Sequence, residues 1–133
     1  MNNYIEIDVS DWYVEKWINA EWLYAKCYEY LSDIPDKTSG VYYIFDCDEL
    51  LYIGTSVNLK GRLVDHLLVN SNTKEFIRRA TRVECVLIAD KDKRCIFEYT
   101  EIVNREPSKN KVLPRLSSNQ NKVIEFLRKE TLE

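Results

Sequence analysis

Four side chains of this sequence are of the types that metal-assisted hydrolysis of a phosphodiester bond requires. Tyr42 and Tyr52 stand in two neighbouring apolar runs. Arg62 and Glu98 follow in two stretches of helical character. The reaction needs a base that takes a proton from water, a divalent cation on the phosphate oxygens, and a positive side chain for the developing charge. Strand tyrosines are also common structural residues and single glutamates commonly face solvent, so residue types alone leave both interpretations open.

The segment that carries the tyrosines has the pattern of a β-hairpin. Residues 40–45 and 50–54 are short runs rich in β-branched and aromatic side chains, and the polar residues 46–49 between them have the length of a hairpin loop. Residues 82–89 alternate with a period of two, which predicts a third strand. The two tyrosines are therefore expected on adjacent strands of a small antiparallel sheet.

A helix is predicted directly after the hairpin. Ser56 or Asn58 can cap it, and it extends over about residues 59–68, with leucines repeating on the inward face. Arg62 and His66 lie one turn apart on a different stripe of this helix. The helix thus presents a guanidinium and an imidazole side by side.

Three further helices are expected in the rest of the chain. Thr73 can cap a short one over residues 74–80, and a longer one over about residues 91–106 ends at Pro107. Glu98 lies at the edge of the apolar arc of the longer helix, whereas Glu101 is turned further towards solvent. A closing helix begins at about Asn119 and places its apolar residues inward.

The N-terminal part has a different character. After a short apolar alternation at residues 4–9, Ser10 can cap a helix that extends to about Leu31 and ends before Pro35. Such an aromatic face is typical of a core, and a face that binds a partner is the alternative. The stripe consists of Trp12, Trp17, Tyr24, Tyr28 and Leu31.

Composition restricts the classes of protein to which the chain can belong. Its 133 residues fit one domain, and no stretch has the roughly 20 consecutive apolar residues of a membrane span. The N-terminus lacks the basic start and apolar run of a secretory signal, so we expect a soluble, cytoplasmic protein, in a bacterium or in a phage-infected host. The cysteines lack the CxxC spacing of a zinc site and are expected to be free thiols: Cys27, Cys47, Cys85 and Cys95.

Charge is distributed unevenly along the chain. The net charge is -3, which by itself argues against a nucleic-acid partner because binding to phosphate requires positive potential. Residues 1–50 are strongly acidic, however, and residues 51–133 carry an excess of Lys and Arg. One surface could therefore attract phosphate while another avoids it, although ordinary variation between solvated faces gives the same asymmetry.

Five short landmarks, in this order, resemble the GIY-YIG nuclease family. Two of them are the tripeptides at residues 40–42 and 52–54, and the third is the segment 58–62. The fourth is Glu98, within a helix, and the fifth is the pair Pro107 and Asn110 that follows the helix. The resemblance covers about residues 40–110. Thr55 departs from it, since many relatives carry a lysine there, and one phosphate contact is then missing.

The resemblance implies an α/β (α+β) fold in which helices flank a small three-stranded antiparallel sheet. On that basis we expect a single domain that has its nuclease-like core at residues 37–112. An acidic, aromatic helical extension would precede the core at residues 1–36, and a C-terminal helix would follow it at residues 113–133. The family often attaches a DNA-reading module to this domain, and none is expected here.

The resemblance also implies a role for each matching residue, with one divalent ion, Mg²⁺ or Mn²⁺, as cofactor. The paired tyrosines are Tyr42 and Tyr52, and the metal ligand is Glu98. Arg62 is the arginine that stabilises the phosphate, and His66 is the accessory group beside it. The supporting residues are Asn110, by its amide, and Gly40 and Gly54, which permit close backbone geometry. A phenol with a pKa near 10 is a poor base unless a neighbour lowers that value. We favour Tyr42 as the base and Tyr52 as the residue that orients water, with the reverse assignment open.

Each of these assignments has an alternative. Arg62 could be a solvated helix charge and His66 a structural imidazole. Glu101 could replace Glu98 as the ligand. Asn110 could serve only to cap the backbone of its loop.

The expected function is that of a stand-alone DNA endonuclease, selective for a DNA structure or with little sequence preference. The alternatives are a binding module that has the same fold but no turnover, and an N-terminal helix that mediates self-association or masks the cleft. Five basic side chains are the expected nucleic-acid contacts: Lys60, Lys74, Arg78, Arg79 and Arg82.

Overall fold

The computed structural model describes residues 3–10, 25, 27–68 and 75–132. Strands and helices follow one another in the order β1 (Tyr4–Asp8), β2 (Gly40–Asp46), β3 (Glu49–Ser56), α3 (Leu59–Leu67), a 3-10 helix (Ile77–Arg79), β4 (Arg82–Leu87), α4 (Lys91–Arg105) and α5 (Ser118–Leu132). The predicted hairpin, the helix after it and the later helix that carries Glu98 are thus present within a few residues of their expected limits.

The sheet has four strands and not the three that we predicted. Its order is β1-β4-β2-β3, and every neighbouring pair is antiparallel. The additional strand, β1, comes from the alternation at residues 4–9 and pairs with β4, with Tyr4 opposite Val86. Within it only Ile7 is buried. A strand of five residues gives only a weak pattern in the sequence. The strand that stabilises β1 by pairing with it, β4, lies far along the chain.

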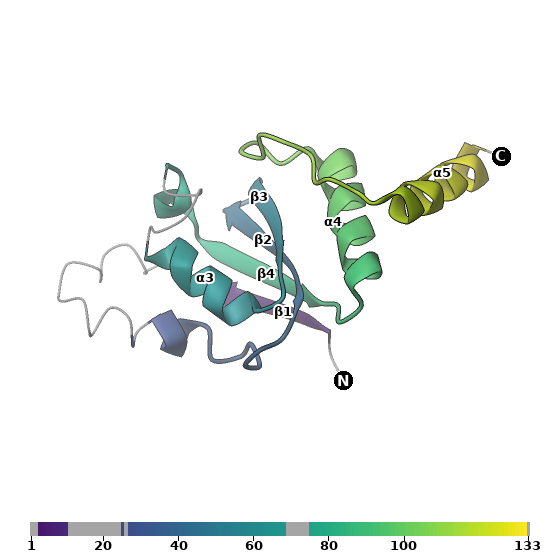
Figure 1. The fold of residues 1–133 in the computed structure, drawn as a ribbon. Coiled ribbons are helices and arrows are strands. Elements are labelled where there is room, and N and C mark those ends of the chain that lie inside the picture. Colours follow the sequence, from purple (N-terminus) through teal and green to yellow (C-terminus); the bar gives the residue numbers. More distant parts are fainter. Residues whose placement is uncertain (1–2, 11–24, 26, 69–74, 133) are drawn as a thin grey trace.

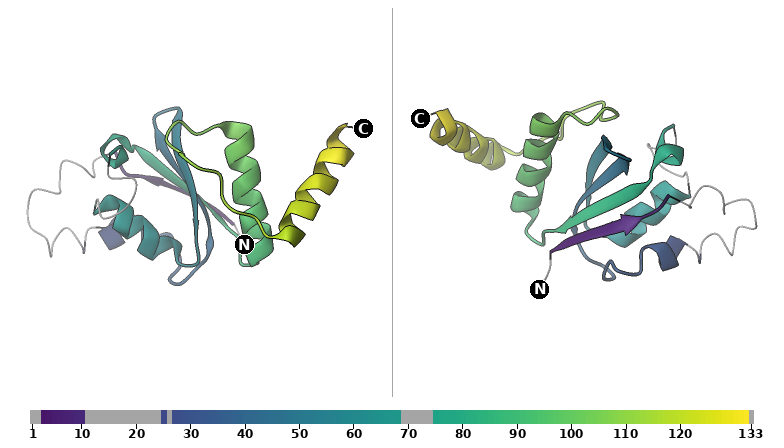
Figure 2. Two further views of the ribbon diagram at one scale, coloured as in Figure 1. Left: turned by 45° about the horizontal axis from the view of Figure 1, so that its top comes forward. Right: turned by 180° about the vertical axis from the view of Figure 1, so that it is seen from behind.

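Helices cover both faces of the sheet. Figure 2 shows the strands between α3 on one side and α4 on the other. Since alternate side chains of a strand point to opposite faces, β2 contributes Tyr42 and Ile44 to the larger core beneath α3. The same strand contributes Tyr43 and Phe45 to a smaller core that includes Ile102 of α4. The two candidate tyrosines belong to the α3 side.

Side-chain caps fix the starts of the two helices that carry candidate residues. The Asn58 side chain accepts a hydrogen bond from the Gly61 amide, 3.2 Å away, so Asn58, and not Ser56, caps α3. Asp90 accepts from the Lys93 amide, 2.9 Å away, at the start of α4. That helix ends at Glu106, in a left-handed conformation, directly before Pro107.

Two predicted helices lie partly outside the residues that the structure describes. Most of the N-terminal helix, residues 11–24 and 26, is not described, and neither are Thr73 and Lys74. Residues 27–30 are helical, in agreement with the end of that first helix. The short helix predicted over residues 74–80 is wrong in its described part, which forms a single 3-10 turn at Ile77–Arg79.

The C-terminal helix, α5, projects from the side of α4 that faces away from the sheet (Figures 1 and 2). Its first turn is tied to α4 by Gln120, whose amide donates to the Asp92 carboxylate over 2.8 Å. Of the helices in the described ranges, none combines the length and the apolar character needed to cross a membrane.

Candidate active site

The phenol of Tyr42 lies across the glycine of the neighbouring strand. Tyr42 stands in the centre of β2, opposite Gly54 of β3, and is 1% exposed. A Cβ atom on Gly54 would collide with the Tyr42 phenol ring and its hydroxyl. Glycine is therefore required at residue 54 because the aromatic side chain occupies the space that any other residue would fill.

A buried hydrogen bond joins Tyr42 to His66. The Tyr42 hydroxyl lies 2.7 Å from Nε2 of His66, an imidazole with 0% exposure on the inner side of α3. Burial, with a smaller effect of the Arg62 charge, lowers the pKa of His66 to about 3, so the ring is neutral at physiological pH. A neutral imidazole can accept the phenol proton at Nε2 when Nδ1 carries the ring proton.

This buried imidazole gives the folding stability a pH dependence. The pKa of His66 is lower in the folded protein than its ordinary value of 6.5, so protonation favours unfolding and stability falls as the pH drops below about 6.5. We expect His66 to account for a loss of about 2 kcal/mol between pH 7 and pH 5. Urea unfolding of the wild type and of His66→Gln in EDTA at both pH values would measure it. An equal pH dependence in the two proteins would contradict the expectation.

Tyr52 and Arg62 complete the cluster around the Tyr42 phenol. The ring of Tyr52 is centred 6.2 Å from that of Tyr42 and 6.1 Å from that of His66. Burial and the neighbouring Tyr52 raise the pKa of Tyr42, whereas a hydrogen bond from Arg62 and its charge oppose that rise. Arg62 therefore lies in electrostatic reach of the Tyr42 hydroxyl, on the helix that also carries His66.

Glu98 projects from the face of α4 that packs against the sheet. The buried residues of this helix are Arg94, Glu98 and Ile102, one turn apart. Glu98 is 8% exposed, and its carboxylate makes no hydrogen bond or ion pair with the part of the chain that the structure describes. Burial raises its pKa to about 7, against the effect of the Arg94 charge. Its own charge contributes to the raised pKa of Tyr42, which places it in electrostatic reach of the phenol.

An unpartnered, buried carboxylate has the chemistry of a cation ligand, because a bound cation removes the cost of its ionisation. Within the described ranges, no group of three His, Cys, Asp or Glu side chains could enclose a metal ion. Magnesium suits a site with one carboxylate, since it retains several waters and is commonly completed by substrate phosphates. The residues present therefore fit a divalent ion held by Glu98.

Glu101, the alternative ligand, has another partner. The Tyr43 hydroxyl donates to it over 2.5 Å, and Arg105 lies 4.0 Å away. Tyr43 points to the face of the sheet opposite to Tyr42. Glu101 thus fastens α4 to β2 one turn beyond Glu98.

Asn110 binds backbone. Its side chain accepts from the Ile53 amide and donates to the Ile53 carbonyl, both over 2.9 Å. The amides of Ser108 and Lys109 donate to the carbonyls of Leu50 and Leu51 in the same way. Residues 108–110 therefore cover the outer edge of β3 beside Tyr52, and Asn110 binds the backbone of this strand and not that of its own loop.

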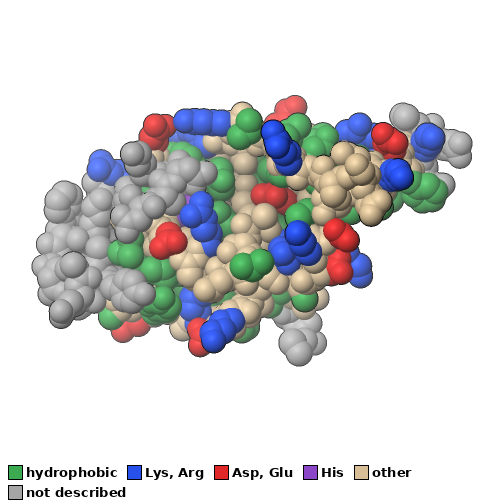
Figure 3. All heavy atoms as spheres, viewed as in Figure 1, with side chains coloured by type: hydrophobic (Ala, Val, Ile, Leu, Met, Phe, Trp, Pro, Cys, Tyr) green, Lys and Arg blue, Asp and Glu red, His purple; other side chains and the backbone are tan. Residues whose placement is uncertain are grey.

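Three of the five predicted phosphate contacts are engaged with carboxylates. The Lys60 ammonium lies 2.8 Å from Asp36. Arg79 pairs with Asp46 and Glu49, and Arg82 pairs with Glu84 while it stacks on Phe45. Arg78 is exposed, and Lys74 lies outside the described residues. On the face in view in Figure 3, Lys and Arg side chains are interspersed with Asp and Glu and form no continuous basic surface.

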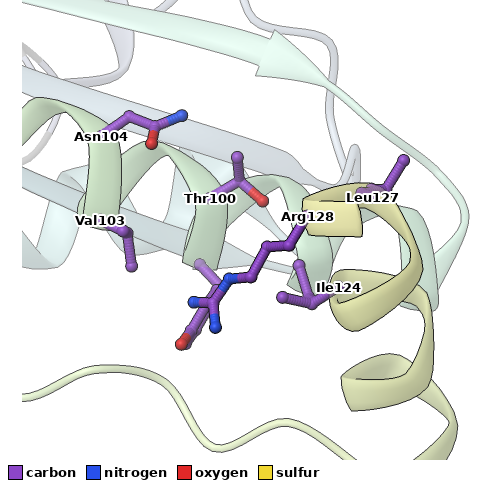
Figure 4. A pocket seen from close by; sticks show the side chains of 7 residues that line it. Thr100, Val103, Asn104, Ile124, Leu127 and Arg128 are labelled. Atoms are coloured by element: carbon purple, nitrogen blue, oxygen red, sulfur yellow. The ribbon is translucent and has the colours of Figure 1, made fainter. Parts of the chain in front are cut away.

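A groove of about 420 Å³ lies elsewhere, between α4 and α5. Figure 4 shows its walls, which include Val103 and Thr100 from α4 and Ile124, Leu127 and Arg128 from α5. None of the candidate catalytic residues lines it, and its walls carry no carboxylate. The candidate catalytic residues therefore lie outside this groove.

Sequence reasoning missed two features of the site. Arg94 is buried and donates to the carbonyls of Ile88 and Ala89, four residues before Glu98. The spacing of Arg94, Glu98 and Ile102 already indicated a shared face, but not that this face is buried. The steric requirement at Gly54 depends on cross-strand register, which no local pattern contains.

Fold and site together define a small α+β domain in which two phenols, an imidazole, a guanidinium and a buried carboxylate gather around β2 and β3. The model of the GIY-YIG catalytic domain matches residues 38–111. That span is more than half of the chain, so the protein belongs to the GIY-YIG family.

One curated protein matches a large part of this chain. The UvrABC system protein C of Fervidobacterium nodosum is 27% identical over 110 residues, which are 76% of this chain and 19% of that protein. The chain thus spans about a fifth of the length of this curated relative.

Solved structures share the fold. The GIY-YIG N-terminal endonuclease domain of UvrC from Thermotoga maritima, bound to magnesium as its catalytic divalent cation, superposes with a TM-score of 0.55 at 21% identity. The comparison covers 70% of this chain and 100% of that domain. A point mutant of the same domain, bound to its catalytic divalent cation, also has a TM-score of 0.55, over 71% of this chain.

Proposed function

We propose that this protein is a metal-dependent endonuclease that hydrolyses phosphodiester bonds in DNA. The observation that carries the proposal is the hydrogen bond between the buried Tyr42 hydroxyl and neutral His66. In electrostatic reach of it lies the Glu98 carboxylate, which has no hydrogen-bond or ion-pair partner among the described residues. A structural core has no need of an unpartnered carboxylate, because its burial costs free energy. Membership of the GIY-YIG family supports the same assignment.

Each residue has a role in the proposed reaction. Glu98 would hold one Mg²⁺ or Mn²⁺, which when bound supplies positive charge to the phosphate oxygens. Tyr42 would take a proton from the attacking water, and His66 would accept the phenol proton at Nε2. Tyr52 would orient that water, and Arg62 would stabilise the negative charge that develops on the phosphate.

Recognition of DNA would depend on the phosphates and not on base sequence. Lys60, Arg79 and Arg82 would contact phosphate only by exchanging a carboxylate partner, so they contribute little affinity. Arg78 and Lys74 remain proposed contacts. A weakly basic surface is consistent with little sequence specificity and with selection of a DNA structure.

The proposal is tested with defined substrates. Purified protein is incubated with plasmid, linear duplex, single-stranded, flap and branched DNA in Mg²⁺ or Mn²⁺, with EDTA as control, and the cut positions are mapped. We expect nicks or cuts that require the divalent ion. Absence of cleavage of every substrate, together with DNA binding that is equal with and without metal, would instead identify a binding module that has the same fold.

The clamp between Tyr43 and Glu101 leads to a prediction about the cation. Tyr43→Phe removes the hydrogen bond that fastens α4 to β2 one turn beyond Glu98. We expect the affinity for Mn²⁺ to fall by a few-fold to about tenfold, with kcat retained at saturating metal. Glu101→Gln is the matched control, because the amide oxygen still accepts from Tyr43. Calorimetric titration with Mn²⁺ measures this affinity. An unchanged affinity in Tyr43→Phe would show that the hydrogen bond between Tyr43 and Glu101 does not influence cation binding.

A further inference from the structure

A polar groove of about 400 Å³ follows the outer face of α3 beside the tyrosine cluster. Asn58, Arg62 and Asp65 line it from α3 and its cap, at spacings that share one helical face. The facing wall includes Tyr28, from the segment that precedes the family-matched residues 38–111. This groove is thus formed in part by a region that the GIY-YIG domain does not include.

Arg62 connects this groove to the candidate active site. Its side chain lines the groove, and its positive charge also acts on the Tyr42 hydroxyl, whose pKa it lowers. A phosphate stabilised by Arg62 would therefore lie at one end of the groove. The nucleotide attached to that phosphate would extend along α3 towards Tyr28.

The other lining residues suit a base better than a second phosphate. Tyr28 is 38% exposed and offers an aromatic surface, on which a nucleobase can stack. Asp65 is exposed in the same groove, and its carboxylate repels phosphate but accepts hydrogen bonds from the exocyclic amino group of a base. Pockets of about 300–1,000 Å³ take ligands of drug size, so the groove has room for one nucleotide.

We propose that this groove binds an unpaired base adjacent to the phosphate that is cut, so that the substrate is single-stranded DNA or the single-stranded part of a flap or junction. The proposal rests on the proposed nuclease function. A base within an intact duplex is stacked and paired, and its extrusion costs a few kcal/mol. The groove therefore favours DNA in which that cost is already removed.

Binding is measured separately from cleavage, so that the two proposals can fail independently. Fluorescence anisotropy in EDTA gives the affinity for a labelled single-stranded 12-mer and for the corresponding duplex. Tyr28→Leu is expected to weaken single-strand binding about 5-fold to 100-fold and to leave duplex binding unchanged, in line with the loss of one stacked base. Tyr28→Phe, which retains the ring, should bind as the wild type does.

Asp65 supplies a second and independent test. Asp65→Asn is expected to change the relative affinity for oligonucleotides rich in cytosine and in thymine, whereas Asp33→Asn, at an exposed position outside the groove, should not. If Tyr28→Leu binds the single strand as tightly as the wild type, or loses duplex affinity to the same extent, the groove does not hold an unpaired base. If the selective loss occurs in a protein that cuts nothing, the groove assignment stands and the nuclease assignment fails.

Discussion

Glu98→Gln is expected to abolish cation-dependent cleavage and at the same time to stabilise the fold in the absence of metal. The carboxylate is the proposed cation ligand, and the amide that replaces it carries no charge, so we expect kcat to fall by about a thousandfold or more. Loss of activity with a gain in stability is typical of a residue retained for function and not for folding.

The direction of the stability change follows from the pKa of Glu98. Because burial raises that pKa from 4.5 to about 7, ionisation opposes folding, and the wild type loses stability as the pH rises through this range. At pH 8 in EDTA the variant should therefore be more stable by about 1–3 kcal/mol. The two proteins should differ less at pH 4.5, where the carboxyl group is protonated in the folded protein and about half protonated in the unfolded chain.

Thermal unfolding with and without MgCl2 checks both parts of this expectation. Added Mg²⁺ should raise the Tm of the wild type, because the ion binds only the folded protein, and should leave the Tm of Glu98→Gln unchanged. Glu101→Gln is the control for removal of a nearby negative charge. A variant that cuts as fast as the wild type would remove Glu98 from the mechanism, and a variant less stable at pH 8 would show that its carboxylate supports the fold.

Tyr42→Phe should produce the second large effect, a fall in kcat of about 10²-fold to 10⁴-fold. The substitution removes only the hydroxyl that would take a proton from water, and the phenyl ring still fills the space above Gly54. It also leaves Nε2 of His66 without its partner in the core, so the free energy of unfolding should fall by about 1–3 kcal/mol.

Tyr99→Phe provides a matched comparison for this variant. Tyr99 lines the groove between α4 and α5, so its hydroxyl lies away from the tyrosine cluster. Single-turnover cleavage at saturating metal should separate the two variants, with Tyr99→Phe indistinguishable from the wild type. Retention of full single-turnover rate in Tyr42→Phe would transfer the role of base to Tyr52, the assignment that sequence reasoning left open.

Local patterns in the sequence were sufficient for the elements that carry the site. The β-branched and aromatic runs of β2 and β3, the cap at Asn58 and the proline after α4 are signals within a few residues of the structures they predict. The family landmarks are likewise short motifs. β1 was not recognised as a strand, because its stabilising partner is β4, more than seventy residues later.

Only the tertiary structure decided what each candidate side chain touches. The sequence left His66 open between an accessory group and a structural imidazole, and its burial against Tyr42 results from packing between residues 24 positions apart. Lys60 appeared to be a phosphate contact until Asp36 was found beside it, again 24 positions away. Glu101 was distinguished from Glu98 by its hydrogen bond to Tyr43 of β2, on the α4 side of the sheet.

The sequence by itself therefore determined the family, the order of the main elements and the positions of the candidate catalytic residues, because backbone propensities and short motifs are encoded locally. Burial, protonation and the choice between a carboxylate and a phosphate as partner depend on contacts between residues distant along the chain. These properties arise only when the sheet packs against its two covering helices, and they determine which of the candidate residues can act together.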